Sequence, residues 1–135
     1  MMTSVRGLGH LALRVSNLAR ARAFYVGILK LPVRFEGPGR LLLDVHGIIL
    51  ALIGDDPHTA ENDHFDPFRV GLDHLALSVP DVEALGGLLT ELNQAGVLNH
   101  GIEVDEVTGA SYISFYDPDG IAWELYVTPV VRAAQ

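Results

Sequence analysis

Hydrophobic and polar residues alternate along two short stretches of this chain, and the two stretches are nearly identical. Residues 7–15 read GLGHLALRV and residues 71–79 read GLDHLALSV, so seven of nine positions recur after 64 residues. Every second residue is a large apolar one, which is typical of a β-strand with one buried face. His10 and His74 fall at matching mid-strand positions on the other face. The repeat predicts two copies of one structural module.

A helix is expected after each of these strands. Ser16 or Asn17 can cap the first helix and Asp81 the second, and Gly96 is placed to end the second. Apolar residues follow the caps at helical spacing. They are Leu18, Ala21, Phe24, Tyr25 and Ile28 in the first module, and Leu85, Leu88, Leu89 and Leu92 in the second.

Short strands are expected after each helix, separated by turn residues. His46-Gly47 fits a tight hairpin, and Asp117-Pro118-Asp119-Gly120 fits a turn. The predicted strands cover residues 33–36, 40–45 and 48–53 in the first module, and a weakly patterned region 97–108, then 111–116 and 121–127, in the second. Residues 128–135 are expected to form a tail.

The pattern therefore predicts an α+β fold of two βαβββ modules. Module one spans about residues 5–54, a linker 55–70 and module two about 71–128. The linker is the longest irregular stretch and contains five acids together with His58 and His64. It connects the modules, and a lid over a site is a further role that long loops often have.

Composition and charge narrow the kinds of partner. Apolar residues make up 49% of the chain and the mean hydropathy is +0.28, which is sufficient for a packed core. No apolar run approaches the roughly 20 residues that span a bilayer, and no secretory signal is evident, so we expect a cytoplasmic protein. The net charge of −8 argues against nucleic acid or an anionic membrane as partner. Residues 70–135 carry ten acids and one base, so the second module lacks a cationic clamp for a phosphonate.

Three side chains are candidates for metal ligation. Trp123 and Leu125 are expected to cover the core, which places Glu124 on the opposite strand face, the one we infer for His74. If the faces of His10, His74 and Glu124 line the inside of curved sheets, two imidazoles and one carboxylate converge. Such a set leaves open positions on a divalent metal. Each residue alone also has an ordinary interpretation, as a hydrogen-bonded strand histidine or an exposed edge charge.

These motifs resemble the vicinal oxygen chelate superfamily, which includes glyoxalase I, extradiol dioxygenases, fosfomycin-resistance transferases and bleomycin-resistance proteins. The resemblance covers residues 5–128 and is most specific in residues 114–127, which read SFYDPDGIAWELYV. It implies paired modules forming an open, curved mixed-sheet cup around one divalent metal (Fe, Mn, Zn, Ni or Co), with ligands at His10, His74 and Glu124. It also implies a homodimer, in which His10 could come from the partner subunit.

Departures from the family pattern narrow the expected activity. Aligning Gly47 with Gly120 places Ala51 where glyoxalase I has a fourth ligand, which argues against that activity. The absence of Lys and Arg between Val70 and Val131 makes phosphonate binding doubtful. Extradiol enzymes use an added acid–base histidine. The candidates here match only by residue type, and each is more readily explained as a solvated histidine in a loop or turn. They are His46, His58, His64 and His100.

The expected cup face carries small and aromatic residues. They are Ala12, Ala76, Ser78, Tyr112, Ser114, Ala122 and Tyr126. They suggest a small, weakly polar organic substrate whose own oxygens complete the metal shell. Tyr112 and Tyr126 are candidate proton or hydrogen-bond donors to a metal-bound oxygen, or they simply pack and bind water. Two hypotheses follow: a metalloenzyme acting through bidentate oxygen coordination, and a metal-free protein that sequesters a small molecule.

Overall fold

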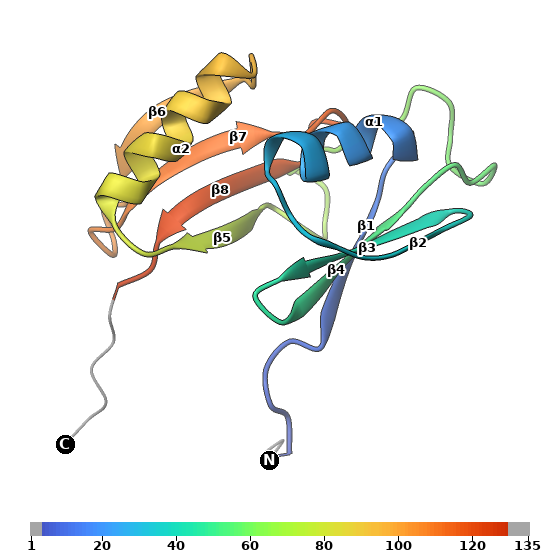
Figure 1. Cartoon of the computed structure of the whole chain (residues 1–135), viewed down its shortest axis with the longest axis horizontal. Helices are drawn as coiled ribbons and strands as arrows, with labels where there is room; N and C mark the ends of the chain where they lie inside the picture. The colour runs from blue at the N-terminus through green and yellow to red at the C-terminus, as the bar shows by residue number, and fades with distance from the viewer. Residues whose placement is uncertain (1–3, 130–135) are drawn as a thin grey trace. The chain divides into compact units, whose positions relative to one another are not determined.

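The computed structural model describes residues 4–129, and the chain divides into two compact units, Met1–Asp63 and His64–Gln135. Both units have the element order strand, helix, then three strands (Figure 1). Each contains one four-stranded sheet with a parallel pair at one edge and antiparallel pairs elsewhere. The predicted α+β class with mixed sheets is confirmed. No helix within residues 4–129 is long and apolar enough to span a membrane.

The sheet of the first unit has the order β1-β4-β3-β2, with β1 parallel to β4. Its elements are β1 (His10–Arg14), α1 (Leu18–Arg22), the π-helix η1 (Ala23–Ile28), β2 (Val33–Gly37), β3 (Arg40–Val45) and β4 (Ile48–Ile53). One sheet face is apolar and buried, with Leu13, Leu43, Leu50 and Leu52 at 8% exposure or less. These side chains form the core of the unit.

The first helix begins at the predicted cap but changes type along its length. The Asn17 side chain accepts a hydrogen bond from the Arg20 backbone N–H at 2.8 Å, so Asn17 is the N-cap. After Arg22 the helix widens, and the Leu29 N–H donates to the Phe24 carbonyl at 3.0 Å, five residues back. Phe24 and its neighbour Tyr25 are both buried, 5% and 0% exposed. The expected single α-helix is therefore an α-helix followed by a π-helix.

The sheet of the second unit has the order β5-β8-β7-β6, with β5 parallel to β8. Its elements are β5 (Leu75–Val79), α2 (Val82–Gln94), β6 (Asn99–Val104), β7 (Ser111–Tyr116) and β8 (Ala122–Val127). Asp81 caps α2 by accepting from the Ala84 N–H at 2.8 Å, as predicted. Gly96, with φ of +72°, follows the last helical turn.

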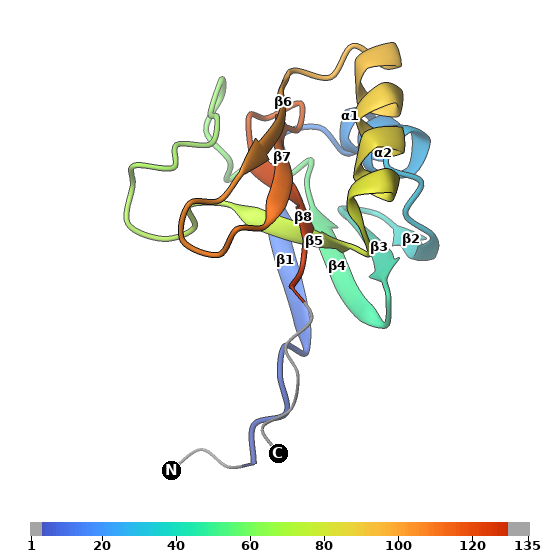
Figure 2. The same ribbon diagram turned by 90° about the vertical axis from the view of Figure 1, so that its left-hand side faces the viewer.

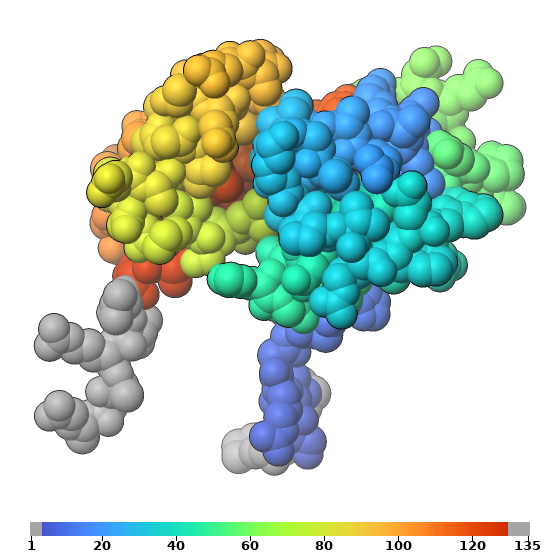
Figure 3. Space-filling view, in the orientation of Figure 1, coloured from blue at the N-terminus to red at the C-terminus, as the bar shows by residue number. Residues whose placement is uncertain are grey.

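Helix α2 buries Leu85 and Leu92, and its outer flank lies at the surface of the unit (yellow in Figure 3). The apolar sheet face is formed by side chains of β7 and β8 that are at most 4% exposed: Ile113, Phe115, Trp123 and Leu125. The rings of Phe115 and Trp123 stack with their centroids 6.4 Å apart. The alternation in β8 thus behaves as predicted, with Trp123 and Leu125 in the core and Glu124 on the other face.

Strand register identifies which residues share the face opposite this core. In the second unit Ala76 pairs with Glu124, and Glu124 pairs with Ser114. The predicted common face of Glu124 and Ala76 is confirmed. One detail of the prediction is wrong: His10 is the first residue of β1 and His74 immediately precedes β5, so neither is mid-strand. Both therefore lie where a strand begins, beside the connections that lead into it.

The connection from residue 54 to residue 74 contains turns but no helix or strand, as expected (Figure 2). Most of the predicted tail, residues 130–135, lies outside the described residues.

Candidate metal and substrate site

A cavity of about 290 Å³ opens on the polar face of the second unit. His74 and Glu124 contribute to its wall, and so does Ser114 from the neighbouring strand. The remaining wall is apolar, aromatic or acidic: Pro67, Phe68, Asp73, Tyr116, Ala122 and Trp123. Its volume is at the low end of the range of about 300–1,000 Å³ that is usual for small-molecule sites.

Inside this cavity a histidine faces a carboxylate. The His74 Nε2 atom lies 3.6 Å from the Glu124 Oε1 atom, which is longer than a hydrogen bond. The other ring nitrogen, Nδ1, lies 2.6 Å from the Asp73 Oδ1 atom. In the neutral tautomer that donates its Nδ1–H to Asp73, the Nε2 lone pair faces Glu124. This is the carboxylate–histidine arrangement that supports metal ligands in proteins.

The Glu124 carboxylate stands in a partly buried, acidic surrounding. Its side chain is 19% exposed. Burial raises the pKa of Glu124 above its usual value, His74 opposes that shift, and the nearby acids Asp105, Glu103 and Asp73 add to it. A cation in the cavity would stabilise the ionised form of Glu124 against these effects.

The other residues predicted from the second module have the following positions. Ser114 lines the cavity, whereas Ala76 and Ser78 lie on the exposed part of β5, where the Ser78 and Thr128 hydroxyls are 2.8 Å apart. The Tyr112 and Tyr126 rings stack with their centroids 6.4 Å apart.

Both of these tyrosine hydroxyls have partners. The Tyr126 hydroxyl is 2.6 Å from the Thr108 hydroxyl, and the Tyr112 hydroxyl donates to the Glu103 carboxylate at 3.4 Å. Burial and the charges of Glu103 and Glu124 raise the pKa of Tyr112. A phenol with a raised pKa stays protonated and able to donate over a wider range of pH.

A third tyrosine, which was not among the candidates, lines the cavity itself. The Tyr116 hydroxyl is 3.2 Å from the His100 Nε2 atom, and the two rings form a T-shaped contact. His100 lies in β6, so the expectation of a loop or turn histidine is wrong for this residue. Alternation along residues 111–116 puts Tyr116 on the face of Tyr112 and Ser114, so this pattern could have identified it. In contrast, Pro67 and Phe68 precede the second copy of the repeat and have no periodic pattern that could have identified them. Asp73 lies within that copy but differs from Gly9 at the matching position of the first copy.

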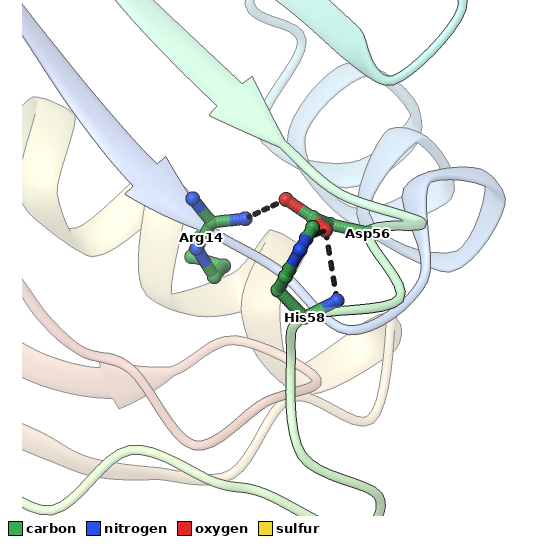
Figure 4. A network of polar contacts seen from close by, with 3 residues as sticks. All are labelled: Arg14, Asp56 and His58. Atoms are coloured by element: carbon green, nitrogen blue, oxygen red, sulfur yellow. Dashed lines mark hydrogen bonds and ion pairs between the residues drawn. The ribbon is translucent and has the colours of Figure 1, made fainter.

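The first unit carries the other predicted residues, His10 and Ala12. Both are on β1, where His10 pairs with Ile49 and Ala12 with Ala51. Arg14 is on the same strand face, and its Nη1 atom lies 3.0 Å from the Asp56 Oδ2 atom (Figure 4). The backbone N–H of His58 donates to Asp56, and this bond, with the His58 ring, holds the pKa of Asp56 below its usual value. The network fixes the start of the connection beside the end of β1.

Within residues 4–129 no three His, Asp or Glu side chains gather closely enough to hold a metal. His74 and Glu124 are brought together in the second unit, and His10 belongs to the first.

Comparisons with known proteins agree with the observed fold. A family model described as the Glyoxalase/Bleomycin resistance protein/Dioxygenase superfamily matches residues 7–125. The uncharacterized protein YaeR of Escherichia coli (strain K12) is 32% identical over 93% of this chain and 98% of its own length.

Two solved structures are similar over nearly their whole length. A glyoxylase/bleomycin resistance protein/dioxygenase domain from Frankia sp. EAN1pec has a TM-score of 0.79 and 26% identity, over 93% of this chain and 99% of that one. A mutant of the fosfomycin resistance protein FosX from Listeria monocytogenes, solved with Mn(II) and a dihydroxypropylphosphonic acid, has a TM-score of 0.71 and 18% identity, over 93% of both chains.

Proposed function

We propose, from the premise that this chain belongs to the Glyoxalase/Bleomycin resistance protein/Dioxygenase superfamily, that it is a divalent-metal-dependent enzyme. Its ligands would be His74, Glu124 and His10, and its substrate a small organic molecule bound through two adjacent oxygens. The observation that carries the proposal is the facing pair in the second unit, His74 Nε2 and Glu124 Oε1, 3.6 Å apart on a cavity wall.

The donor set fits a divalent cation. Two donors that share one ion through bonds of about 2.1 Å stand roughly 3–3.5 Å apart, and the observed separation needs only a small adjustment. The Asp73 carboxylate at 2.6 Å from His74 Nδ1 would keep the ring oriented. Imidazole with carboxylate suits Fe, Mn, Zn, Ni or Co. The presence of Mn(II) in the FosX structure is consistent with such a site in this fold.

When bound, the metal would supply a Lewis acid that polarises substrate oxygens, or a redox centre if it is iron. The chain's own residues would orient the substrate and handle protons. Tyr116 lines the cavity, and its hydroxyl can give its own proton to His100 Nε2, 3.2 Å away, as it accepts one from the substrate. Tyr112 and Tyr126 are on the same sheet face and remain predicted donors. Ala12, Ala76, Ser78 and Ser114 remain predicted neighbours of the substrate.

We further propose that the chain acts as a cytoplasmic homodimer. His10 lies in the unit that does not contain the other two ligands, so the site would be completed within one chain or across two. Mixing a His10→Ala variant with a Glu124→Ala variant distinguishes these arrangements. Restored metal binding in the mixture supports a site shared between chains, whereas no restoration supports a site within one chain.

Mn(II) titration of protein freed of metal by a chelator tests the proposal. Wild type is expected to bind about one Mn(II) per chain. Glu124→Ala is expected to lose at least roughly 100-fold in affinity, since even groups one shell removed from a metal contribute about 10–100-fold. Glu91→Ala is a matched control, because Glu91 is an exposed acid on α2 of the same unit. Equal affinity of Glu124→Ala and wild type would overturn the ligand assignment.

The alternative is a metal-free protein that sequesters a small molecule. The stacked tyrosines Tyr112 and Tyr126 beside Glu103 favour it, since aromatic faces and carboxylates together bind cations. This alternative predicts stoichiometric ligand binding that a chelator leaves unchanged and that proceeds without turnover. The metalloenzyme predicts loss of binding and of activity on chelation.

A further inference from the structure

The start of the second unit places an aromatic side chain at the cavity that holds His74 and Glu124. The Phe65 backbone N–H donates to the Asp119 carbonyl at 3.1 Å, which joins this segment to the turn between β7 and β8. Three residues later the Phe68 N–H donates to the Asp66 side chain at 2.9 Å and closes a local turn. Phe68 is thus held by its backbone at a defined place on the cavity wall.

Phe68 is 96% exposed although it lines this cavity. Single exposed apolar residues are common and by themselves indicate nothing. Val107, for example, is 93% exposed in the same unit and does not line the cavity. Phe68 differs because it lines the same cavity as His74 and Glu124, the two side chains proposed to hold the metal that would bind the oxygens of a ligand. An apolar group attached to those oxygens in the ligand would cover the Phe68 ring.

The charges around the cavity restrict which further charged groups the ligand can have. Asp73 and Glu124 are both on the wall, and together they balance one divalent cation. Residues 64–129 contain eleven acids and a single base, Arg69, which does not line the cavity. A ligand with a further carboxylate or phosphate would meet no opposite charge on this wall. The wall therefore favours an uncharged ligand.

We propose that Phe68 is a specificity-determining residue that packs against the ring of an uncharged, ring-bearing substrate with two adjacent oxygens. This inference rests on the proposed function, because the metal held by His74 and Glu124 would bind the oxygens. Tyr116 supplies a second aromatic side chain on the cavity wall. Removal of the Phe68 ring weakens binding of the ring-bearing ligand and leaves metal affinity unchanged.

Three probes separate the contributions of ring and charge: 2-hydroxy-1-phenylethanone, hydroxyacetone, which has the same oxygens without the ring, and mandelate, which has the ring and a carboxylate. Calorimetric titration of the Mn(II)-loaded protein measures each affinity. Wild type is expected to prefer the phenyl ketone to both other probes. In Phe68→Ala that preference over hydroxyacetone falls about 3- to 10-fold, the equivalent of one aromatic contact. Phe68→Tyr keeps the preference, and Val107→Ala is the control for loss of an exposed apolar group.

The outcomes distinguish this inference from the function on which it rests. Normal Mn(II) binding with an undiminished preference in Phe68→Ala overturns the role of Phe68 alone. Mandelate binding as tightly as the phenyl ketone, or no binding of the ketone to the metal-loaded protein, overturns the substrate class. Failure of wild type to bind Mn(II) refutes the proposed function and this inference with it. Since the Phe68 side chain is exposed, its truncation removes no core packing.

Discussion

Replacement of Asp117 by alanine should strongly destabilise the second unit, because this carboxylate organises the turn that leads into β8. Asp117 is 5% exposed, and its Oδ1 atom accepts hydrogen bonds from the backbone N–H groups of Asp119 at 2.9 Å and Ile121 at 2.8 Å. The same turn contains the Asp119 carbonyl that holds Phe65 and precedes Glu124 by five residues. Loss of the turn would therefore disturb both strand β8, which contains Glu124, and one wall of the cavity.

The magnitude follows from the surroundings of the two donors. Ile121 is 4% exposed, so its orphaned N–H costs about 1.5–3 kcal/mol, whereas water can replace the bond to the more exposed Asp119 at a cost of about 0.5–1.5 kcal/mol. Asp117→Ala should lower the free energy of unfolding by roughly 2–4 kcal/mol. Asp117→Asn keeps an acceptor and loses only the charge assistance, about 1 kcal/mol or less.

Urea unfolding followed by tryptophan fluorescence measures this effect, since Trp123 is the single tryptophan and is buried in the same unit. With a slope near 2 kcal/mol per molar urea, the midpoint should fall by about 1–2 M in Asp117→Ala. A loss below about 1 kcal/mol in the alanine variant, or equal losses in both variants, would refute the reasoning that two charge-assisted bonds hold the turn.

Three further predictions concern packing and charge. Gly54→Ala should destabilise the first unit by about 1–3 kcal/mol, because the added Cβ would lie 2.9 Å from Val15 and Leu18 side-chain atoms. Gly27→Ala is the control, because a Cβ added there meets no atom within 4 Å. Thermal unfolding of the two variants measures the difference. The pKa of Asp56 is lowered from its ordinary value of 3.8, so its stabilising contribution is present above that value and is lost as the pH falls through the folded-state pKa. An NMR titration of the Asp56 carboxyl should show the lowered midpoint. Asp56→Asn should reduce the loss of stability that acid causes. The pKa of Glu124 is raised, so in chelator-treated protein its contribution to stability is present at acid pH and is lost as the pH rises through the raised pKa. When the urea midpoint is plotted against pH, Glu124→Gln should flatten the curve over this range. An unchanged curve would contradict the burial of the charge.

Alternation along the strands predicted much of the second unit's site. A period of two residues put Trp123 and Leu125 in the core and Glu124 opposite them, and the strand register bears this out. Helix caps at Asn17 and Asp81 were predictable as well, because a short polar side chain before an apolar helical pattern has few other roles.

Features that depend on tertiary packing or irregular backbone were not predictable. The first helix widens at Ala23, where two adjacent aromatic residues are both buried, and helical periodicity does not encode this arrangement. Phe68 reaches the cavity from a stretch with no repeating pattern. A single sequence also cannot show that His100 contacts Tyr116, because strand β6 is irregular and its register shifts between Asn99 and Ile102.

The central claim is that His74 and Glu124 hold a divalent metal, and metal content tests it most directly. Elemental analysis would be made on wild type and His74→Ala, purified without chelator and then reconstituted with Fe, Mn, Zn, Ni or Co. The account predicts near one metal ion per chain in wild type and a loss of most of it in His74→Ala. Equal metal content in the two proteins, or none in either after reconstitution, would contradict it.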